Sequence, residues 1–252
     1  MVDKNREHYT VLYSRLRVES VVETARNPTF LPEAIRKHTS WHGLYRGGLM
    51  DRLPGKSVLE LGAGDGLNAL LMAQLGAIVT AIEIAEPAVR VLREASKALH
   101  LQVEALHGDF LELDLPSFDL IVGKAFLHHL DHEVEERVLR KCARLLRPDG
   151  EARFHEPAVN SRLLDTIRCL IPVPGRPSVL SRKRFGAWKA LDPHPERDNS
   201  SAHYLAIGSR YFGTVSITAF GGLERFRRIL PDGRTGEAYA AWAFTAERYL
   251  PK

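Results

Sequence analysis

Three glycines alternate along the chain directly after a short apolar run, and their spacing is the clearest chemical signal in the sequence. The run covers residues 57–61, and Gly62, Gly64 and Gly66 follow it. Glycine permits positive φ and lets a ligand approach the bare backbone. A buried strand that ends in a glycine turn and leads into a helix points its amide groups at a nucleotide-like ligand. The stretch therefore predicts a nucleotide-type site, with the carboxylate of Glu60 at its edge.

The glycine spacing differs from two familiar phosphate-binding patterns. The dinucleotide fingerprint is G-x-G-x-x-G, whereas here the third glycine comes one position early and Leu67 stands in its place. The Gly55-Lys56-Ser57 sequence matches the end of a P-loop, but that motif needs a glycine at position 50, which is Met50. The predicted strand also follows this segment instead of preceding it. We therefore exclude a P-loop.

A second acidic residue stands where a ribose is commonly bound. Residues 77–84 are rich in β-branched side chains, which predicts a strand. Glu83 lies near its end, 23 positions after Glu60. A carboxylate at the end of the second strand of a nucleotide-binding sheet is placed to accept hydrogen bonds from both ribose hydroxyls. Glu83 is therefore the predicted ribose ligand.

Histidines and an acid follow the next predicted strands, over residues 118–122 and 151–155, at the sheet edge where ligands bind. Histidine suits proton transfer near neutral pH. The candidates for a general base are His128, His129, His155, Glu156 and His203. Because neighbouring strand residues point to opposite faces, at most one of His155 and Glu156 faces a substrate. A purely structural role for these side chains stays open.

Metal-ligand spacing is weak in this chain. His129 and His132 lie at i and i+3 with Asp131 between them, but no third ligand is evident, so we predict no metal site. Cys142 and Cys169 give neither a disulfide framework nor a zinc pattern.

Strands and helices alternate around these residues, which predicts an α/β fold. Besides the strands named above, the pattern predicts further elements: helices over 67–75, 88–99 and 131–146, a third strand over 101–106 and a turn over 146–150. Such alternation is typical of a Rossmann-like, doubly wound, mostly parallel sheet. Residues 214–218 alternate and predict a sixth strand. A seventh strand is doubtful, and residues 240–245 are its best candidate.

Composition shifts and breaks divide the chain into four expected regions. They are a helical N-terminal lid (1–53), the sheet core (54–157), a helical cap inserted after strand five (158–212), and a C-terminal part with a remaining strand and a helix (213–252). The lid is amphipathic from Tyr9 onward, with breaks expected at Pro28 and Pro32. Its candidate aromatic walls over a ligand are Tyr9, Tyr13 and Trp41.

Together, these ordered motifs resemble the class I S-adenosylmethionine (SAM) methyltransferases over residues 55–157. The acid and glycines of residues 60–66, Glu83, the Asp109-Phe110 pair and the turn at residues 147–150 come in that family's order. The Leu127-His128-His129-Leu130 segment is similar to ubiquinone/menaquinone-type and natural-product methyltransferases.

The resemblance implies SAM as cofactor and S-adenosylhomocysteine as product. In that family's pattern Glu60 anchors the methionine amino group, Glu83 takes the ribose, and Asp109 with Phe110 takes the adenine. The residues expected at the cofactor are Glu60, Gly62, Ala63, Gly64, Gly66, Glu83, Ile84, Asp109, Phe110, Lys124 and Tyr13.

Three functions compete. The first is transfer of a methyl group to an oxygen, carbon or nitrogen of a small quinone-like or secondary-metabolite acceptor, which the cap would enclose. The second is methylation of RNA or of a carrier-protein-bound substrate, because 16 Lys and Arg face 10 Asp and Glu from residue 151 onward. Nucleic acid is disfavoured, since residues 123–126 lack the motif of amino-directed DNA enzymes and a nucleophilic cysteine. The third is a SAM-binding protein that does not methylate.

The composition, with 44% hydrophobic and 26% charged residues among 252, is that of a globular chain. No apolar run approaches the roughly 20 residues that span a bilayer, and the polar residues 1–6 lack a signal-peptide core. We expect a cytoplasmic monomer or homodimer that does not bind membranes.

Overall fold

A parallel sheet forms the centre of the chain in the computed structural model, which describes residues 2–173, 175–191, 194–219, 221–223, 230 and 233–249. Within these residues the sheet has five strands in the order β3-β2-β1-β4-β5. Their bounds are β1 Ser57–Leu61, β2 Ile78–Glu83, β3 Val103–His107, β4 Phe118–Lys124 and β5 Leu146–His155. The predicted Rossmann-like α/β fold is confirmed.

Strand β1 is central because both of its faces are apolar. Val58, Leu59 and Leu61 are all 0% exposed, and β1 pairs in parallel with β2 on one side and β4 on the other. Val58 belongs to one hydrophobic cluster and Leu59 to a second cluster on the other face of the sheet. Burial on both faces is the reason that this strand reads as a continuous apolar run.

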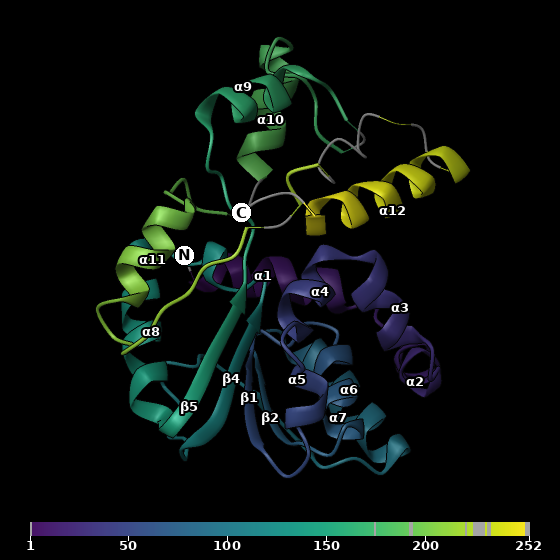
Figure 1. Cartoon of the computed structure of the whole chain (residues 1–252), viewed down its shortest axis with the longest axis vertical. Helices are drawn as coiled ribbons and strands as arrows, with labels where there is room; N and C mark the ends of the chain where they lie inside the picture. Colours follow the sequence, from purple (N-terminus) through teal and green to yellow (C-terminus); the bar gives the residue numbers. More distant parts are fainter. Residues whose placement is uncertain are drawn as a thin grey trace.

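Helices cover both faces of the sheet (Figure 1). One face packs against α6 (Leu67–Gln74) and α7 (Glu86–Leu99) together with N-terminal helices. The other face packs against α8 (His132–Leu145) and α11 (Ser201–Gly208). The carboxylate of Asp131 caps α8 by accepting a hydrogen bond from Val134 N at 2.9 Å.

Five short helices precede the sheet. They are α1 Val2–Tyr13, α2 Val18–Arg26, α3 Phe30–Lys37, α4 Thr39–Tyr45 and α5 Leu49–Arg52. Helix α1 crosses above the carboxyl ends of the strands (Figure 1). The break expected at Pro28 falls between α2 and α3, but the one expected at Pro32 is wrong. Pro32 lies in the first turn of α3, where proline is tolerated because its missing N–H has no intrahelical partner.

Helices α9 (Arg162–Leu170) and α10 (Arg182–Leu191) stand above the same sheet edge, and α12 (Arg234–Tyr249) lies beside them (Figure 1). The strand predicted over 214–218 is wrong, because these residues have no regular structure. Val215 packs instead against Gly208 of α11, where an added Cβ would meet it at 3.3 Å. Residues 240–245 are helical within α12, so they form no seventh strand.

The turn predicted over residues 146–150 is absorbed into the start of β5. That strand begins at Leu146, with a register shift opposite residues 118–120 and a positive φ of 63° at Asp149. Among the described residues, every helix is too short or too polar to cross a membrane.

Candidate functional site

The three glycines form a tight turn at the carboxyl end of β1. Their φ angles are 64°, 58° and 75°, in the left-handed region that favours glycine. A Cβ at Gly62 would lie 2.7 Å from the ring of Phe126, and one at Gly64 would lie 2.8 Å from the hydroxyl oxygen of Tyr13. The backbone of the glycine loop therefore lies close to Phe126, which follows β4, and to Tyr13 at the end of α1.

Glu83 joins this loop to the end of β2. Its Oε2 accepts a hydrogen bond from Gly64 N at 2.9 Å, and its Oε1 accepts from Ile84 N at 2.8 Å and Ala85 N at 3.0 Å. The side chain is 7% exposed. Oε2 has a second lone pair, because each carboxylate oxygen has two acceptor sites. The carboxylate thus stands at the loop as expected, while its contact with a ribose stays a prediction.

Glu60 lies under the loop with one carboxylate oxygen that lacks a hydrogen bond. Its Oε1 accepts from Asn68 Nδ2 at 2.7 Å, and Asn68 Oδ1 accepts from the hydroxyl of Tyr45 at 2.8 Å. Its Oε2 is buried and has no hydrogen-bond partner among the described residues. Burial raises the pKa of Glu60 to about 7, partly offset by the bond from Asn68 and the nearby charge of Lys124. An acceptor in this state suits a cationic amino group, so the residues fit the amino end of SAM.

The Asp109-Phe110 pair offers less than expected. Asp109 Oδ1 accepts a hydrogen bond from Leu111 N at 2.9 Å, which closes a local turn. Phe110 is 4% exposed, and Lys141 Nζ lies 4.9 Å from its ring centroid. Most of this ring is therefore used in the hydrophobic core, and the half-buried Asp109 is the side chain of the pair that a ligand can reach.

Helix α1 brings two tyrosines over the sheet edge. Tyr13, beside Gly64, stacks on Tyr9 with ring centroids 5.9 Å apart. Burial and the nearby carboxylates of Glu83 and Asp65 raise the pKa of Tyr13. The third predicted aromatic wall, Trp41, instead packs in the core with Lys124 Nζ 3.9 Å from its ring centroid.

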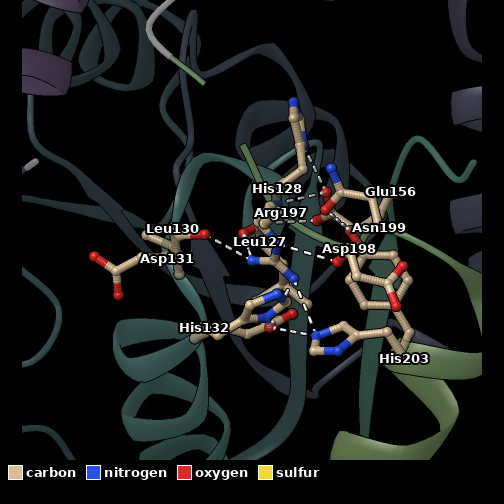
Figure 2. Close-up of polar contacts among 12 residues, drawn as sticks. Leu127, His128, Leu130, Asp131, His132, Glu156, Arg197, Asp198, Asn199 and His203 are labelled. Atoms are coloured by element: carbon tan, nitrogen blue, oxygen red, sulfur yellow. Dashed lines mark hydrogen bonds and ion pairs between the residues drawn. The ribbon is translucent and has the colours of Figure 1, made fainter. Parts of the chain in front are cut away.

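Glu156 accepts hydrogen bonds from the loop that follows β4, residues 126–130, which is named the histidine loop. Its Oε1 accepts from Phe126 N at 2.9 Å and Leu127 N at 2.8 Å, and its Oε2 lies 2.7 Å from His128 Nδ1 (Figure 2). A carboxylate at Nδ1 fixes the tautomer of a neutral imidazole, so His128 Nε2 carries the lone pair. His155 lies elsewhere, against Gly43 of α4, where an added Cβ would be 2.5 Å from its Nδ1. Burial lowers the pKa of His155.

His129 and His194 complete a cluster beside His128. Ring centroids are 4.0 Å apart for His128 and His129, and 4.4 Å apart for His129 and His194. The hydroxyl of Tyr9 lies 3.2 Å from His129 Nε2. Burial, followed by the neighbouring histidines, lowers the pKa of His129 to about 3. The cluster joins the N-terminal helix, the loop after β4 and the segment that follows α10.

Arg197 binds this segment to the loop. Its Nη1 donates to Leu127 O at 3.0 Å and Leu130 O at 2.7 Å, and its Nη2 lies 2.6 Å from Glu135 Oε2 (Figure 2). His203, a base candidate from the sequence, also contacts Glu135, with its Nε2 at 2.7 Å. His203 is therefore part of this buried ionic group and not of the histidine cluster.

Sequence reasoning missed four residues of the site. Asn68 has a detectable signal, since it is a polar residue within the apolar first six positions of the helix after the glycine loop. Tyr45, His194 and Arg197 stand in no local motif, and their roles follow only from long-range contacts.

Residues 58–150 match the family model described as a methyltransferase domain. The core of this chain is therefore similar to a methyltransferase domain over 93 of its 252 residues. Among curated relatives, it is 38% identical over 103 residues to a cypemycin N-terminal methyltransferase from a Streptomyces species. It is 35% identical over 103 residues to a ubiquinone biosynthesis O-methyltransferase from Glaesserella parasuis. These matches cover 40% and 38% of this chain, and 41% and 43% of the relatives' own length.

Solved structures share the fold of this chain. YcgJ from Bacillus subtilis superposes with a TM-score of 0.50 at 21% identity, over 68% of this chain and 67% of its own. A putative sarcosine dimethylglycine methyltransferase from Galdieria sulphuraria gives a TM-score of 0.51 at 19% identity, over 68% of this chain and 58% of its own.

Proposed function

We propose that this chain is a SAM-dependent methyltransferase that acts on a small organic acceptor. The observation that carries the proposal is the pairing of the glycine loop with two buried carboxylates, one bonded to the loop and one with an unsatisfied oxygen. Glu83 Oε2 holds Gly64 N at 2.9 Å, and Glu60 Oε2 is buried without a partner among the described residues. Both carboxylates lie at the carboxyl ends of adjacent strands, where nucleotide-type ligands bind in open α/β sheets.

Each polar group has a role toward the cofactor. Bound SAM supplies a methyl group on a positively charged sulfur, which a nucleophile displaces in line. Glu60 holds the amino group of the methionine part, and Glu83 accepts a hydrogen bond from one ribose hydroxyl with the Oε2 lone pair that Gly64 leaves open. Asp109 accepts from the adenine amino group. The remaining expected residues, Gly62, Ala63, Gly66, Ile84 and Lys124, frame the ligand with backbone and charge, while Phe110 supports Asp109 from the core.

The chain also supplies the acceptor side. Tyr9 and Tyr13 of α1 cover the loop and the histidines, which excludes water from the reacting atoms. Aligning an acceptor atom near the methyl group contributes several kcal/mol of the rate enhancement. Of the four catalytic candidates, His128 and Glu156 face this region directly, His129 borders it, and His155 points toward α4.

The names of the relatives support both oxygen and nitrogen as acceptor atoms. One is an N-terminal methyltransferase and the other a ubiquinone biosynthesis O-methyltransferase. The chain matches only about two fifths of the length of these relatives, so their acceptors are not transferred to it. We infer the class of acceptor from the cap and the histidine loop of this chain instead. These favour a small molecule that the cap encloses.

A second candidate acceptor is a carrier-bound or RNA substrate. The charge excess after residue 150 favours it, and α10 begins with the exposed Arg182-Lys183-Arg184 run. A transferase of this kind would bind its substrate with an affinity that falls steeply as salt increases.

Thermal unfolding with and without SAM, S-adenosylhomocysteine and NAD tests the proposal. A ligand at 100 times its Kd stabilises the folded state by about 2.7 kcal/mol. We expect the first two compounds to raise the Tm and NAD to leave it unchanged. A panel of phenols, amines and quinols is then assayed for formation of S-adenosylhomocysteine. Binding without turnover on any acceptor would favour a SAM-binding protein that does not methylate, and no binding would refute the proposal.

A further inference from the structure

Three imidazoles from two distant parts of the chain converge beside the histidine loop. His128 and His129 follow β4, and His194 lies 65 positions further along, after α10. One ring nitrogen from each of the three lies within 4.8 Å of the other two. The rings are neighbours in every pairing, with centroids 4.0, 4.4 and 5.0 Å apart.

These separations are close to what a metal ion requires. In a tetrahedral zinc site with Zn–N bonds of about 2.0–2.1 Å, the ligand nitrogens lie about 3.4 Å from each other. The three ring nitrogens lie within 4.8 Å of one another, so metal binding requires them to approach by up to about 1.4 Å. Three imidazoles are a recurrent ligand set of sites that keep a fourth position open for water or substrate.

The hydrogen bond behind His128 is of the kind that supports a metal ligand. Glu156 Oε2 lies 2.7 Å from His128 Nδ1, and the side chains are only 5% and 11% exposed. A carboxylate on the far nitrogen orients a ligating histidine and raises its basicity. The carboxylate itself is fixed by the amides of Phe126 and Leu127, so the ring of His128 is held in place from behind.

The third histidine is held in place by Arg197, three residues further along the chain. Arg197 donates to Leu127 O and Leu130 O, the carbonyls on either side of His128 and His129. Its side chain is 1% exposed. The segment that carries His194 is therefore anchored to the loop that carries the other two ligands.

A second group of possible ligands is less suitable. His132, Glu135 and His203 also lie within ligand distance of one another. Arg197 Nη2 already lies 2.6 Å from Glu135 Oε2, so a guanidinium occupies the place of a cation.

We infer that His128, His129 and His194 form a binding site for a divalent first-row transition metal ion, with zinc as the best match. Nitrogen-only ligands favour zinc and its neighbours over magnesium or calcium, which prefer oxygen. The fourth position is open to water or to an oxygen of a ligand.

The role of the metal rests on the proposed function, whereas binding itself does not. An acceptor hydroxyl at the open position gives up its proton to water more readily, because a bound Zn²⁺ lowers the pKa of an attached oxygen. The resulting oxyanion would attack the methyl carbon of SAM, so that the O–C bond forms as the C–S bond breaks and the sulfur leaves with the electron pair as S-adenosylhomocysteine. In this arrangement His128 Nε2 is a ligand, and the acceptor class is a molecule with an ionisable hydroxyl.

The test uses untagged full-length protein freed of metal with a chelator. Co²⁺ and Zn²⁺ are titrated, with the visible absorption of Co²⁺ and the Tm as readouts, and Mg²⁺ serves as the control ion. The variants are His194→Ala and His129→Ala, with His38→Ala, an exposed histidine on the N-terminal helices, as the matched control. We expect one equivalent of Co²⁺ to give visible bands, displaced by Zn²⁺, and at least tenfold weaker binding in both ligand variants.

Three outcomes overturn the inference: no binding of either ion, equal affinity in wild type and His194→Ala, or a loss in His38→Ala as large as in the ligand variants. A Tm equal to that of wild type in the metal-free state shows that the ligand variants fold. SAM binding is measured on the same metal-free protein. If SAM raises the Tm but zinc does not bind, the metal site is refuted while the proposed function stands. If zinc binds but SAM does not raise the Tm, the proposed function is refuted while the metal site stands.

Discussion

Arg197 Nη2 lies 2.6 Å from Glu135 Oε2, and the two side chains are 1% and 0% exposed. The pair joins the segment after α10 to α8, the helix that follows the histidine loop. With its other terminal nitrogen, Arg197 also satisfies the carbonyls at both ends of that loop. The positions of the cap and of the catalytic candidates are thus coupled through one guanidinium.

Replacing Arg197 with alanine should therefore destabilise the protein strongly. The change leaves the charge of Glu135 buried without its partner, which costs about 3–5 kcal/mol. Urea unfolding measures the loss. Lys189→Ala is the control, because the Lys189–Glu196 pair is largely exposed, with side chains 40% and 82% accessible, and is expected to matter by less than about 1 kcal/mol. Similar losses in the two variants would contradict the importance of the buried pair.

Glu83→Ala should weaken SAM binding by about 1–3 kcal/mol, because a charge-assisted hydrogen bond to the ribose is lost. Titration calorimetry checks this value. Since Glu83 also accepts from three backbone amides, the variant should lose stability as well. Comparing affinities at a temperature well below its Tm separates the two effects, and an unchanged affinity would refute the ribose assignment.

Glu60 gives the protein a pH dependence of stability near neutrality. Burial raises its pKa to about 7 in the folded state, against 4.5 for the ordinary side chain. Between these values the folded state binds more protons than the unfolded state, so stability falls as pH rises from about 4.5 to 7.

Glu60→Gln removes this titration and keeps an oxygen for the hydrogen bond from Asn68. Relative to wild type, the variant should be more stable at pH 8 by about 1–3 kcal/mol, with a much smaller difference at pH 5. Lys124 is the positive group beside Glu60, and Asp65 and Glu83 are the negative ones. Thermal unfolding across this pH range decides: an advantage that is equal at both pH values would exclude Glu60 as the cause.

Gly64→Ala should abolish cofactor binding. A left-handed backbone costs about 1–2 kcal/mol in any residue with a Cβ, and here the Cβ also meets the Tyr13 hydroxyl at 2.8 Å. Gly47→Ala is a matched control, because Gly47 has a similar φ of 65° with no atom within 4 Å of its added Cβ. SAM binding should be lost in Gly64→Ala and kept in Gly47→Ala. The difference between the two variants in free energy of unfolding measures the clash between the new Cβ and Tyr13 of α1.

Sequence patterns predict the core of this molecule because its determinants are local. The apolar run of β1, the glycine turn and the acid ending β2 are each encoded within a few neighbouring residues, and the fold bears them out. Residues 214–218 show the opposite case. Their alternation is typical of a strand, but Val215 packs on Gly208, and this tertiary contact outweighs the local preference.

The remainder of the site depends on contacts between residues far apart in the chain. Arg197 bonds to a carbonyl 70 positions earlier, and Tyr9 lies against a histidine 120 positions later. Neither periodicity nor spacing reports such pairings. The helix break predicted at Pro32 is wrong for a different reason. Proline breaks a helix only beyond its first turn, and α3 begins without a side-chain cap that would mark its start in the sequence.

Arg197 bonds to the loop at Leu127 O and Leu130 O, and these bonds do not depend on the side chains between them. They are made to main-chain oxygens, which every amino acid provides. Side chains at positions 128 and 129 can therefore be exchanged while the loop keeps its place under the cap. Under the proposed function, substitutions at a few loop positions would change the acceptor while the glycine loop and the sheet stay as they are.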